Sequence, residues 1–231
     1  MAALPFCLDV GTGNALCLLH GNGEDHTYFS KQISVFSEQY RVIAVDTRGH
    51  GQTPRGGVPF TLSQFAEDLK SLLDKLSIQR ADLLGFSDGG NYAFLFAMRY
   101  PNRVRRLIVV GANLTPTGMK TSLWFAVWRD YLYAGIASFF NPKWRHQREL
   151  SALMALQPHI PVRELRKLQT PTLVLAGTRD VIREKHTRRI ASALPHATLV
   201  LLPGGHNIAQ ETPALFNRTV LDFLATENSI L

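Results

Sequence analysis

Short apolar runs alternate with longer stretches of helical periodicity along most of this chain. The apolar runs, which we interpret as strands, cover residues 6–10, 15–19, 41–45, 81–86, 105–110, 172–176 and 198–202. The helical patterns lie near residues 28–37, 61–76, 89–100, 183–194 and 213–224. Strands that alternate with helices of this length indicate an α/β fold, with a mostly parallel sheet flanked by helices. Ligands in such sheets bind beyond the carboxyl ends of the strands, so functional residues are expected in the loops that follow strands.

Residues 114–169 interrupt this alternation. They contain no strand pattern and include, from residue 121, the aromatic stretch TSLWFAVWRDYLYAGIASFF. We interpret them as a short helical cap, inserted between two parts of the core at residues 1–113 and 170–231. A cap over a pocket needs an apolar inner face of this kind, and Trp124 is expected to contact the substrate. The alternative is that these aromatic residues only pack onto the main sheet.

The composition is that of an ordinary globular chain: 231 residues, of which 45% are hydrophobic and 19% charged. Cys17 lies inside an apolar run and is expected to be a core thiol, which fits a reducing compartment. The N-terminus has no signal-peptide pattern, and Arg129 and Asp130 break the aromatic stretch before it reaches the length of a membrane span. We therefore expect a cytoplasmic protein with no membrane partner.

The net charge is +7, with a pI of about 9.7. Much of the excess lies between residues 143 and 189, and clustered Lys and Arg can indicate nucleic-acid binding. The chain has no recognisable nucleic-acid motif and no basic stripe interleaved with stacking aromatic residues. Solvated helix faces explain the charge more simply, so no nucleic-acid partner is expected.

The string GFSDGG at residues 85–90 follows a strand and precedes a helix. A serine at the apex of a strand–turn–helix connection is typical of a nucleophile elbow, with glycines that let the backbone pass close by. The alternative is a simple glycine turn. Ser87 needs a base to become a good nucleophile.

Two residues after later strands can supply that base and its partner. Asp180 follows the strand in TLVLAGTRD, and His206 follows the strand in TLVLLPGGHNI. The chain order Ser87, Asp180, His206 is that of a hydrolase triad. A backbone N–H of the loop His20-Gly21-Asn22-Gly23 and the amide of Asp88 can supply two donors to an oxyanion.

The motifs HGNGED, DTRGHG, GFSDGG, GTRD and GGHNI occur in this order from about residue 6 to 224. Together they resemble the α/β-hydrolase superfamily, and the chain is most similar to small capped serine hydrolases of the biphenyl-hydrolase-like and carboxylesterase type. The resemblance implies Ser87 as nucleophile, His206 as base and Asp180 as its orienting acid. It also implies the Asn22 and Asp88 amides as oxyanion donors, and no metal or cofactor. Two departures are a shortened N-terminal hairpin, so that the sheet is expected to lack its first edge strand, and a short cap.

The resulting hypothesis is a serine hydrolase that cleaves a small carboxylic ester, thioester or activated amide through an acyl-enzyme on Ser87. The alternatives are C–C bond or lactone hydrolysis with the same triad, and a non-catalytic ligand receptor of the same fold. The expected partner is a small-molecule substrate, and the protein a monomer or homodimer. Asp88 is a second candidate substrate contact: its carboxylate either pairs with a cationic group of the substrate or is simply favoured at a helix N-terminus.

Overall fold

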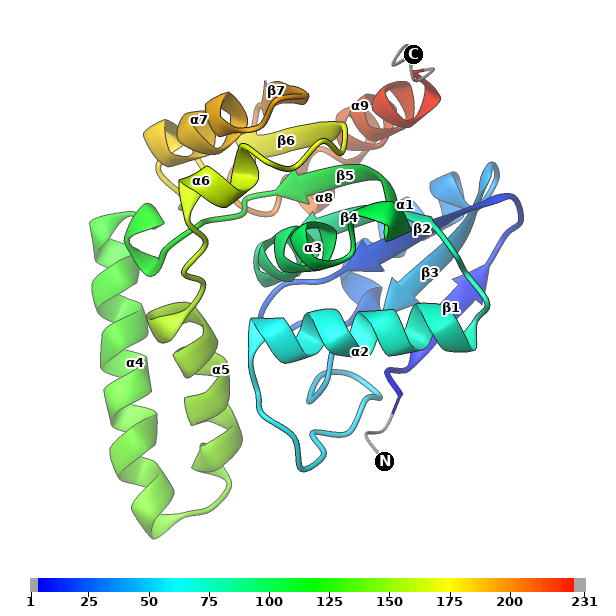
Figure 1. The fold of residues 1–231 in the computed structure, drawn as a ribbon. Coiled ribbons are helices and arrows are strands. Elements are labelled where there is room, and N and C mark those ends of the chain that lie inside the picture. The colour runs from blue at the N-terminus through cyan, green and yellow to red at the C-terminus, as the bar shows by residue number, and fades with distance from the viewer. Residues whose placement is uncertain (1–3, 227–231) are drawn as a thin grey trace.

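A seven-stranded sheet forms the centre of the protein, for which a computed structural model describes residues 4–226 (Figure 1). Its strand order is β1-β3-β2-β4-β5-β6-β7. The edge strand β1 runs antiparallel to β3, and the other neighbouring pairs are parallel. The strands are β1 Cys7–Val10, β2 Asn14–Leu19, β3 Tyr40–Val45, β4 Ala81–Phe86, β5 Val104–Val110, β6 Thr172–Gly177 and β7 Ala197–Leu202. All the predicted strands are confirmed, and one strand precedes β2.

Helices cover both faces of this sheet (Figure 1). They are α1 Ser30–Phe36, α2 Leu62–Lys75, α3 Asp88–Arg99, α4 Thr121–Phe140, α5 Trp144–Leu156, α6 Val162–Leu165, α7 Glu184–Ala193, α8 Ile208–Glu211 and α9 Pro213–Ala225, with short 3-10 turns at His26–Phe29, Pro101–Arg103 and Pro116–Gly118. Apolar residues of α2, α3 and α7 share one core cluster with the sheet, while those of α1, α8 and α9 share the other. Cys17 is fully buried and unpaired, as expected of a core thiol.

The helices α4 and α5 pack against each other and extend away from the sheet on the side of α3 (Figure 1). They come from the region predicted to be a cap. Leu153 of α5 joins the core cluster beneath α2 and α3, which anchors the pair. The extreme ends of the predicted core, residues 1–3 and 227–231, lie outside the described residues. Within residues 4–226, no helix has the length and apolar composition needed to cross a bilayer.

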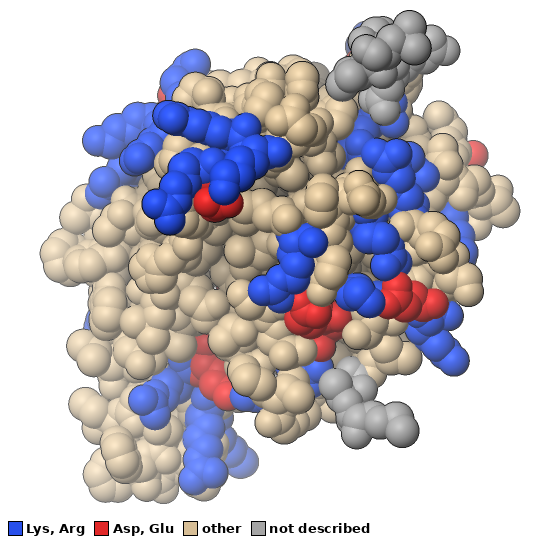
Figure 2. Space-filling model, in the orientation of Figure 1, with Lys and Arg blue, Asp and Glu red and all other residues tan. Residues whose placement is uncertain are grey.

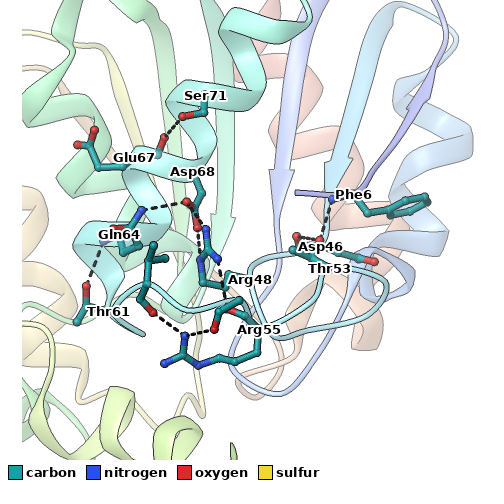
Figure 3. A network of polar contacts seen from close by, with 12 residues as sticks. Phe6, Asp46, Arg48, Thr53, Arg55, Thr61, Gln64, Glu67, Asp68 and Ser71 are labelled. Carbon is teal, nitrogen blue, oxygen red and sulfur yellow. Dashed lines mark hydrogen bonds and ion pairs between the residues drawn. The ribbon is translucent and has the colours of Figure 1, made fainter. Parts of the chain in front are cut away.

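A buried ion pair ties the loop after β3 to helix α2. The guanidinium of Arg48 donates to both carboxylate oxygens of Asp68, at 2.7 Å each, and both side chains are almost fully buried (Figure 3). Arg48 also donates to the carbonyl oxygen of Arg55, and Gln64 donates to Asp68. Nearby, Thr53 accepts from the Phe6 N–H and donates to the Asp46 carbonyl oxygen. Arg48 thus braces the loop from within.

We predict that Asp68→Asn lowers the free energy of unfolding by about 3–5 kcal/mol, because it leaves the buried Arg48 charge without a countercharge. Chemical denaturation measures this change. The matched control is Glu67→Gln on the same helix, whose partner Arg99 lies at the surface, and it should cost less than about 1 kcal/mol. Equal effects of the two substitutions would contradict the assignment.

Candidate active site

Ser87 lies at a strained turn between β4 and α3. Its backbone has φ 52° and ψ −117°, a conformation that non-glycine residues rarely adopt. The Ser87 N–H donates to the Val110 carbonyl oxygen at 2.8 Å, and its own carbonyl accepts from the Asn91 N–H at 3.0 Å. A Cβ placed on Gly89 would lie 2.0 Å from the Leu19 carbonyl oxygen. Only glycine therefore permits this tight passage, which holds the Ser87 side chain at the carboxyl end of β4.

The three residues chosen from chain order form a hydrogen-bonded series. Ser87 Oγ lies 3.2 Å from His206 Nε2, and His206 Nδ1 lies 2.8 Å from Asp180 Oδ1. Asp180 is buried and His206 is partly exposed. The same Asp180 oxygen accepts the Ile182 N–H at 2.8 Å, which fixes the carboxylate. Because a carboxylate accepts the Nδ1 proton, Nε2 is left as the acceptor that faces the serine hydroxyl.

The loops that carry Asp180 and His206 are held close together. A Cβ on Gly177, at the end of β6, would lie 1.9 Å from the Gly205 carbonyl oxygen. The His206 ring also packs against the ring of Phe86, with 4.8 Å between ring centroids. These two contacts determine where the imidazole lies relative to the turn at Ser87.

The backbone N–H groups of Asn22 and Asp88 are the predicted oxyanion donors. Among residues 4–226, neither group finds an acceptor. The two residues are joined through their side chains, since Asn22 Nδ2 donates to Asp88 Oδ2 at 2.9 Å. Asn22 Nδ2 also donates to the Leu150 carbonyl oxygen at 3.0 Å. One side chain thus links the β2 loop, the start of α3 and helix α5.

Two side chains shape the β2 loop, His20 and Glu24, although the sequence pattern assigned neither of them a role. His20 donates from Nδ1 to the Gly21 carbonyl oxygen and accepts the Thr47 N–H at Nε2. Burial lowers the pKa of His20 to about 4, so the ring is neutral at neutral pH. The Gly21 N–H donates to Glu24 Oε2 at 3.0 Å. Burial raises the pKa of Glu24 to about 7, against the lowering effects of that hydrogen bond and of His206.

The carboxylate of Asp88 lies against the pocket beside Ser87. Its second oxygen accepts from Asn91 Nδ2 at 3.1 Å, and Asn91 is in turn bonded to Asn113 in both directions. Burial raises the pKa of Asp88, and the hydrogen bonds from Asn22 and Asn91 oppose that effect. The signal for Asn91 was present in the sequence, because it is a lone amide in the apolar helix NYAFLFAM.

The pocket beside Ser87 is small, with a volume of about 20 Å³. It is lined by triad and elbow residues on one side and by cap-region and loop side chains on the other: Ser87, Asp88, Asn113, Met119, Leu123, Met154, Gln157, Val181, Ile182 and His206. Trp124 is not among them; it packs against Phe125 and Trp128, and its neighbour Leu123 faces the pocket. A second pocket of about 160 Å³ shares Leu123 and Met154, which separate the two spaces.

One group of side chains has the composition of a metal site. Ligand atoms of Asp25, His26 and Asp46 lie within 4.8 Å of one another. His26 is hydrogen-bonded to Asp46 at 2.7 Å, however, and Asp46 also accepts the His26 and Gln52 N–H groups. These bonds account for the cluster as a brace between two loops.

The sheet order, the turn at Ser87 and the hydrogen-bonded series define a class of hydrolase, and sequence comparison identifies it. The profile of the alpha/beta hydrolase fold family matches residues 14–143, more than half of the chain. The chain belongs to this family, and the fold expected from the motifs is confirmed.

Particular relatives differ in the substrates that their names give. RutD of Caulobacter sp. (strain K31), named provisionally as a carbamate hydrolase, is 28% identical over 90% of this chain and 89% of its own. The 2-hydroxymuconate semialdehyde hydrolase of Pseudomonas sp. (strain CF600) is 30% identical over 84% of this chain and 70% of its own. Among solved structures, a thermophilic esterase from Thermogutta terrifontis is similar, with a TM-score of 0.77 and 25% identity over 95% and 92% of the two chains.

We predict that Glu24 makes the stability of the protein fall as pH rises. An unfolded glutamate titrates near pH ~4.3, whereas Glu24 in the folded protein titrates at about 7. Between these values the folded state binds more protons, so the free energy of unfolding decreases with increasing pH. Glu24→Gln keeps an acceptor for the Gly21 N–H and removes the titration.

Thermal unfolding at pH 5 and pH 8 measures the effect. The Tm of Glu24→Gln, relative to wild type, should be higher at pH 8 than at pH 5. Glu38→Gln, which changes an exposed glutamate, should shift the Tm relative to wild type by the same amount at both pH values. If the Glu24→Gln and wild-type curves run parallel, the prediction is wrong.

Proposed function

We propose that this protein is a serine hydrolase that cleaves small carboxylic esters, and related thioesters or activated amides, through an acyl-enzyme on Ser87. The observation that carries the proposal is the series Ser87–His206–Asp180, with spacings of 3.2 and 2.8 Å. Membership in a family of hydrolases supports it. Helices α4 and α5 act as the cap over this site.

The first half of the reaction forms the acyl-enzyme. Ser87 Oγ attacks the substrate carbonyl carbon while its proton passes to His206 Nε2. Asp180 stabilises the resulting imidazolium through Nδ1–H. The negative charge that develops on the carbonyl oxygen is stabilised by the Asn22 and Asp88 N–H groups. Collapse of this tetrahedral species breaks the bond to the leaving alcohol, which takes the proton from His206.

The second half returns the enzyme to its starting state. A water molecule gives a proton to His206 Nε2 and attacks the acyl carbon on Ser87. The new oxyanion uses the same two N–H groups. When it collapses, Ser87 Oγ leaves with the proton from His206, and the carboxylic acid is released. No cofactor is needed at any step.

The size of the pocket favours a small substrate. A volume of about 20 Å³ holds about one water molecule, so even a short ester must displace the side chains of Leu123 and Met154. The adjoining space of about 160 Å³ between α4 and α5 lies directly behind these two side chains. We assign it to the acyl or alcohol group, and substrate binding is then coupled to movement of the cap region.

A second candidate, hydrolysis of a C–C bond or a lactone with the same triad, has one specific point in its favour. It is the 30% identity to a 2-hydroxymuconate semialdehyde hydrolase. A panel that contains short-chain esters, lactones and semialdehyde substrates separates these activities, because each predicts a different preferred compound for the same Ser87 nucleophile.

We predict that substitutions in the triad abolish turnover of a short-chain nitrophenyl ester. By comparison with other triads, kcat should fall by about 10⁶-fold in Ser87→Ala and His206→Ala, and by about 10⁴-fold in Asp180→Asn. Ser87→Ala should also abolish labelling by a fluorophosphonate, because the probe reacts with the activated hydroxyl.

The control is Ser71→Ala on α2, an exposed serine that donates to its own helix, and it should leave both readouts unchanged. Wild-type turnover in any triad variant would exclude the mechanism. A wild-type protein that takes up no probe and turns over nothing in the panel would instead support a ligand-binding role.

We further predict that Asp88 favours substrates with a cationic acyl group. Each carboxylate oxygen accepts one hydrogen bond from an asparagine and has further acceptor capacity for an ammonium group. An α-amino ester should have a kcat/KM about ten- to a hundredfold above its deaminated counterpart. The preference should grow as pH rises through the elevated pKa of Asp88.

Kinetics of the two esters with wild type, Asp88→Asn and Asp222→Asn measure this preference. Asp88→Asn should remove it, whereas the exposed Asp222 should have no influence. Equal kcat/KM values for both esters in the wild-type enzyme would leave Asp88 with only its backbone N–H as a contribution.

A further inference from the structure

Helix α4 presents a row of apolar side chains to solvent, interrupted on the same face by the exposed Arg129. The exposed apolar stripe consists of Phe125, Leu132, Ile136, Phe139 and Phe140, which are 58–86% exposed. Positions separated by seven, eleven and fourteen residues lie on one side of an α-helix. The stripe is therefore a single face about 22 Å long, at 1.5 Å per residue. Its two most exposed members, Phe139 and Phe140, lie at the end of α4 farthest from the sheet (Figure 1).

Basic side chains lie beyond both ends of α4. Lys120 precedes the helix and Lys143 follows it, and both are exposed. Figure 2 shows blue side chains above the start of α4 and beside its lower end, with tan surface between them. The acidic residues of the α4–α5 pair are already engaged: Asp130 pairs with Arg129, and Glu149 pairs with Arg55. The stripe is thus apolar apart from Arg129, whose charge is paired with Asp130, and it is flanked by positive charge at both ends.

A groove lies beside the distal end of the stripe. It has a volume of about 520 Å³ and is lined by Tyr131, Ser138, Phe139, Arg145, Arg148, Glu149 and Ala152. Glu149 accepts two hydrogen bonds from Arg55. Arg145 and Arg148 form no ion pair with a residue between 4 and 226. The groove therefore offers two guanidinium groups next to an exposed phenylalanine, a combination suited to a phosphate headgroup with an adjoining acyl chain.

We propose that the outer face of α4 binds the surface of an anionic lipid bilayer, with Phe139 and Phe140 inserted among the acyl chains and Arg145 and Arg148 on headgroup phosphates. Amphipathic helices with aromatic and basic residues bind membranes in this way without crossing them. A second copy of the chain fits less well. Pairing of two stripes places like-charged ends, Lys120 or Lys143 of each copy, opposite one another, whereas an anionic surface meets both ends favourably.

Co-sedimentation with vesicles tests the proposal. Wild type should bind phosphatidylcholine vesicles that contain phosphatidylserine about tenfold more tightly than pure phosphatidylcholine vesicles, and added salt should weaken the binding. Phe139→Gln/Phe140→Gln and Lys143→Glu/Arg145→Glu should each weaken it about tenfold or more. Circular dichroism would detect unfolding of either double variant. In that case Leu132→Gln/Ile136→Gln tests the same stripe with a different pair of residues.

Matched controls lie at the opposite end of the molecule. Leu215→Gln removes an exposed leucine of α9, and Lys75→Glu/Arg218→Glu makes the same change in net charge as the basic pair. Both should bind like wild type. The proposal is overturned if the vesicles do not bind wild type, if the control variants lose binding equally, or if Phe139→Gln/Phe140→Gln binds normally. It is also overturned if size exclusion shows a dimer that this phenylalanine pair holds together.

Discussion

The backbone of Ser87 is the constraint on which the candidate site depends. A residue with a side chain adopts φ 52° and ψ −117° only where its surroundings enforce that conformation. Here the enforcement comes from the hydrogen bonds of Ser87 to Val110 and Asn91, and from the contact of Gly89 with the carbonyl of Leu19. Burial of the strands on either side offsets the free-energy cost of this turn. The residue that follows in this turn is Asp88, whose N–H finds no acceptor among residues 4–226.

The parallel sheet brings the remaining groups to that turn. Strands β4, β5, β6 and β7 are neighbours in the sheet, so the loops after β4, β6 and β7 open at one edge although they are far apart in the sequence. Asp180 and His206 are 26 residues apart and bond at 2.8 Å because β6 and β7 pair in register. The β2 loop is adjacent on the other side, since β2 pairs with β4. Position in the sheet, more than any local motif, therefore builds the site.

Most of the fold could be predicted from the sequence, because strands buried on both faces appear as uninterrupted apolar runs. The serine, acid and histidine of the candidate site follow such runs in order. The bond between Asn22 and Asp88, and the contact of Glu24 with Gly21, were not predictable, since they depend on how two loops meet. The sequence indicated Trp124 as a substrate contact but did not indicate Leu123, the α4 residue that lines the pocket beside Ser87, for a related reason. Adjacent residues of a helix point about 100° apart, so the rotation of α4 decides which one faces the pocket. Composition alone does not specify that rotation.

Helix α4 carries apolar side chains on two opposite sides. Leu123 faces the pocket, and Val127 and Ala134 are buried on the same side of the helix. The exposed apolar stripe lies on the opposite side. A helix that is apolar on all sides is normally covered on all sides, and within residues 4–226 the protein covers only one. The Arg129–Asp130 pair, which argues against a membrane span in the sequence, lies exposed at the surface and is compatible with a helix that lies along an interface. The break in the apolar stretch and the exposed stripe are therefore consistent: α4 is too polar to cross a bilayer and too apolar to face water alone.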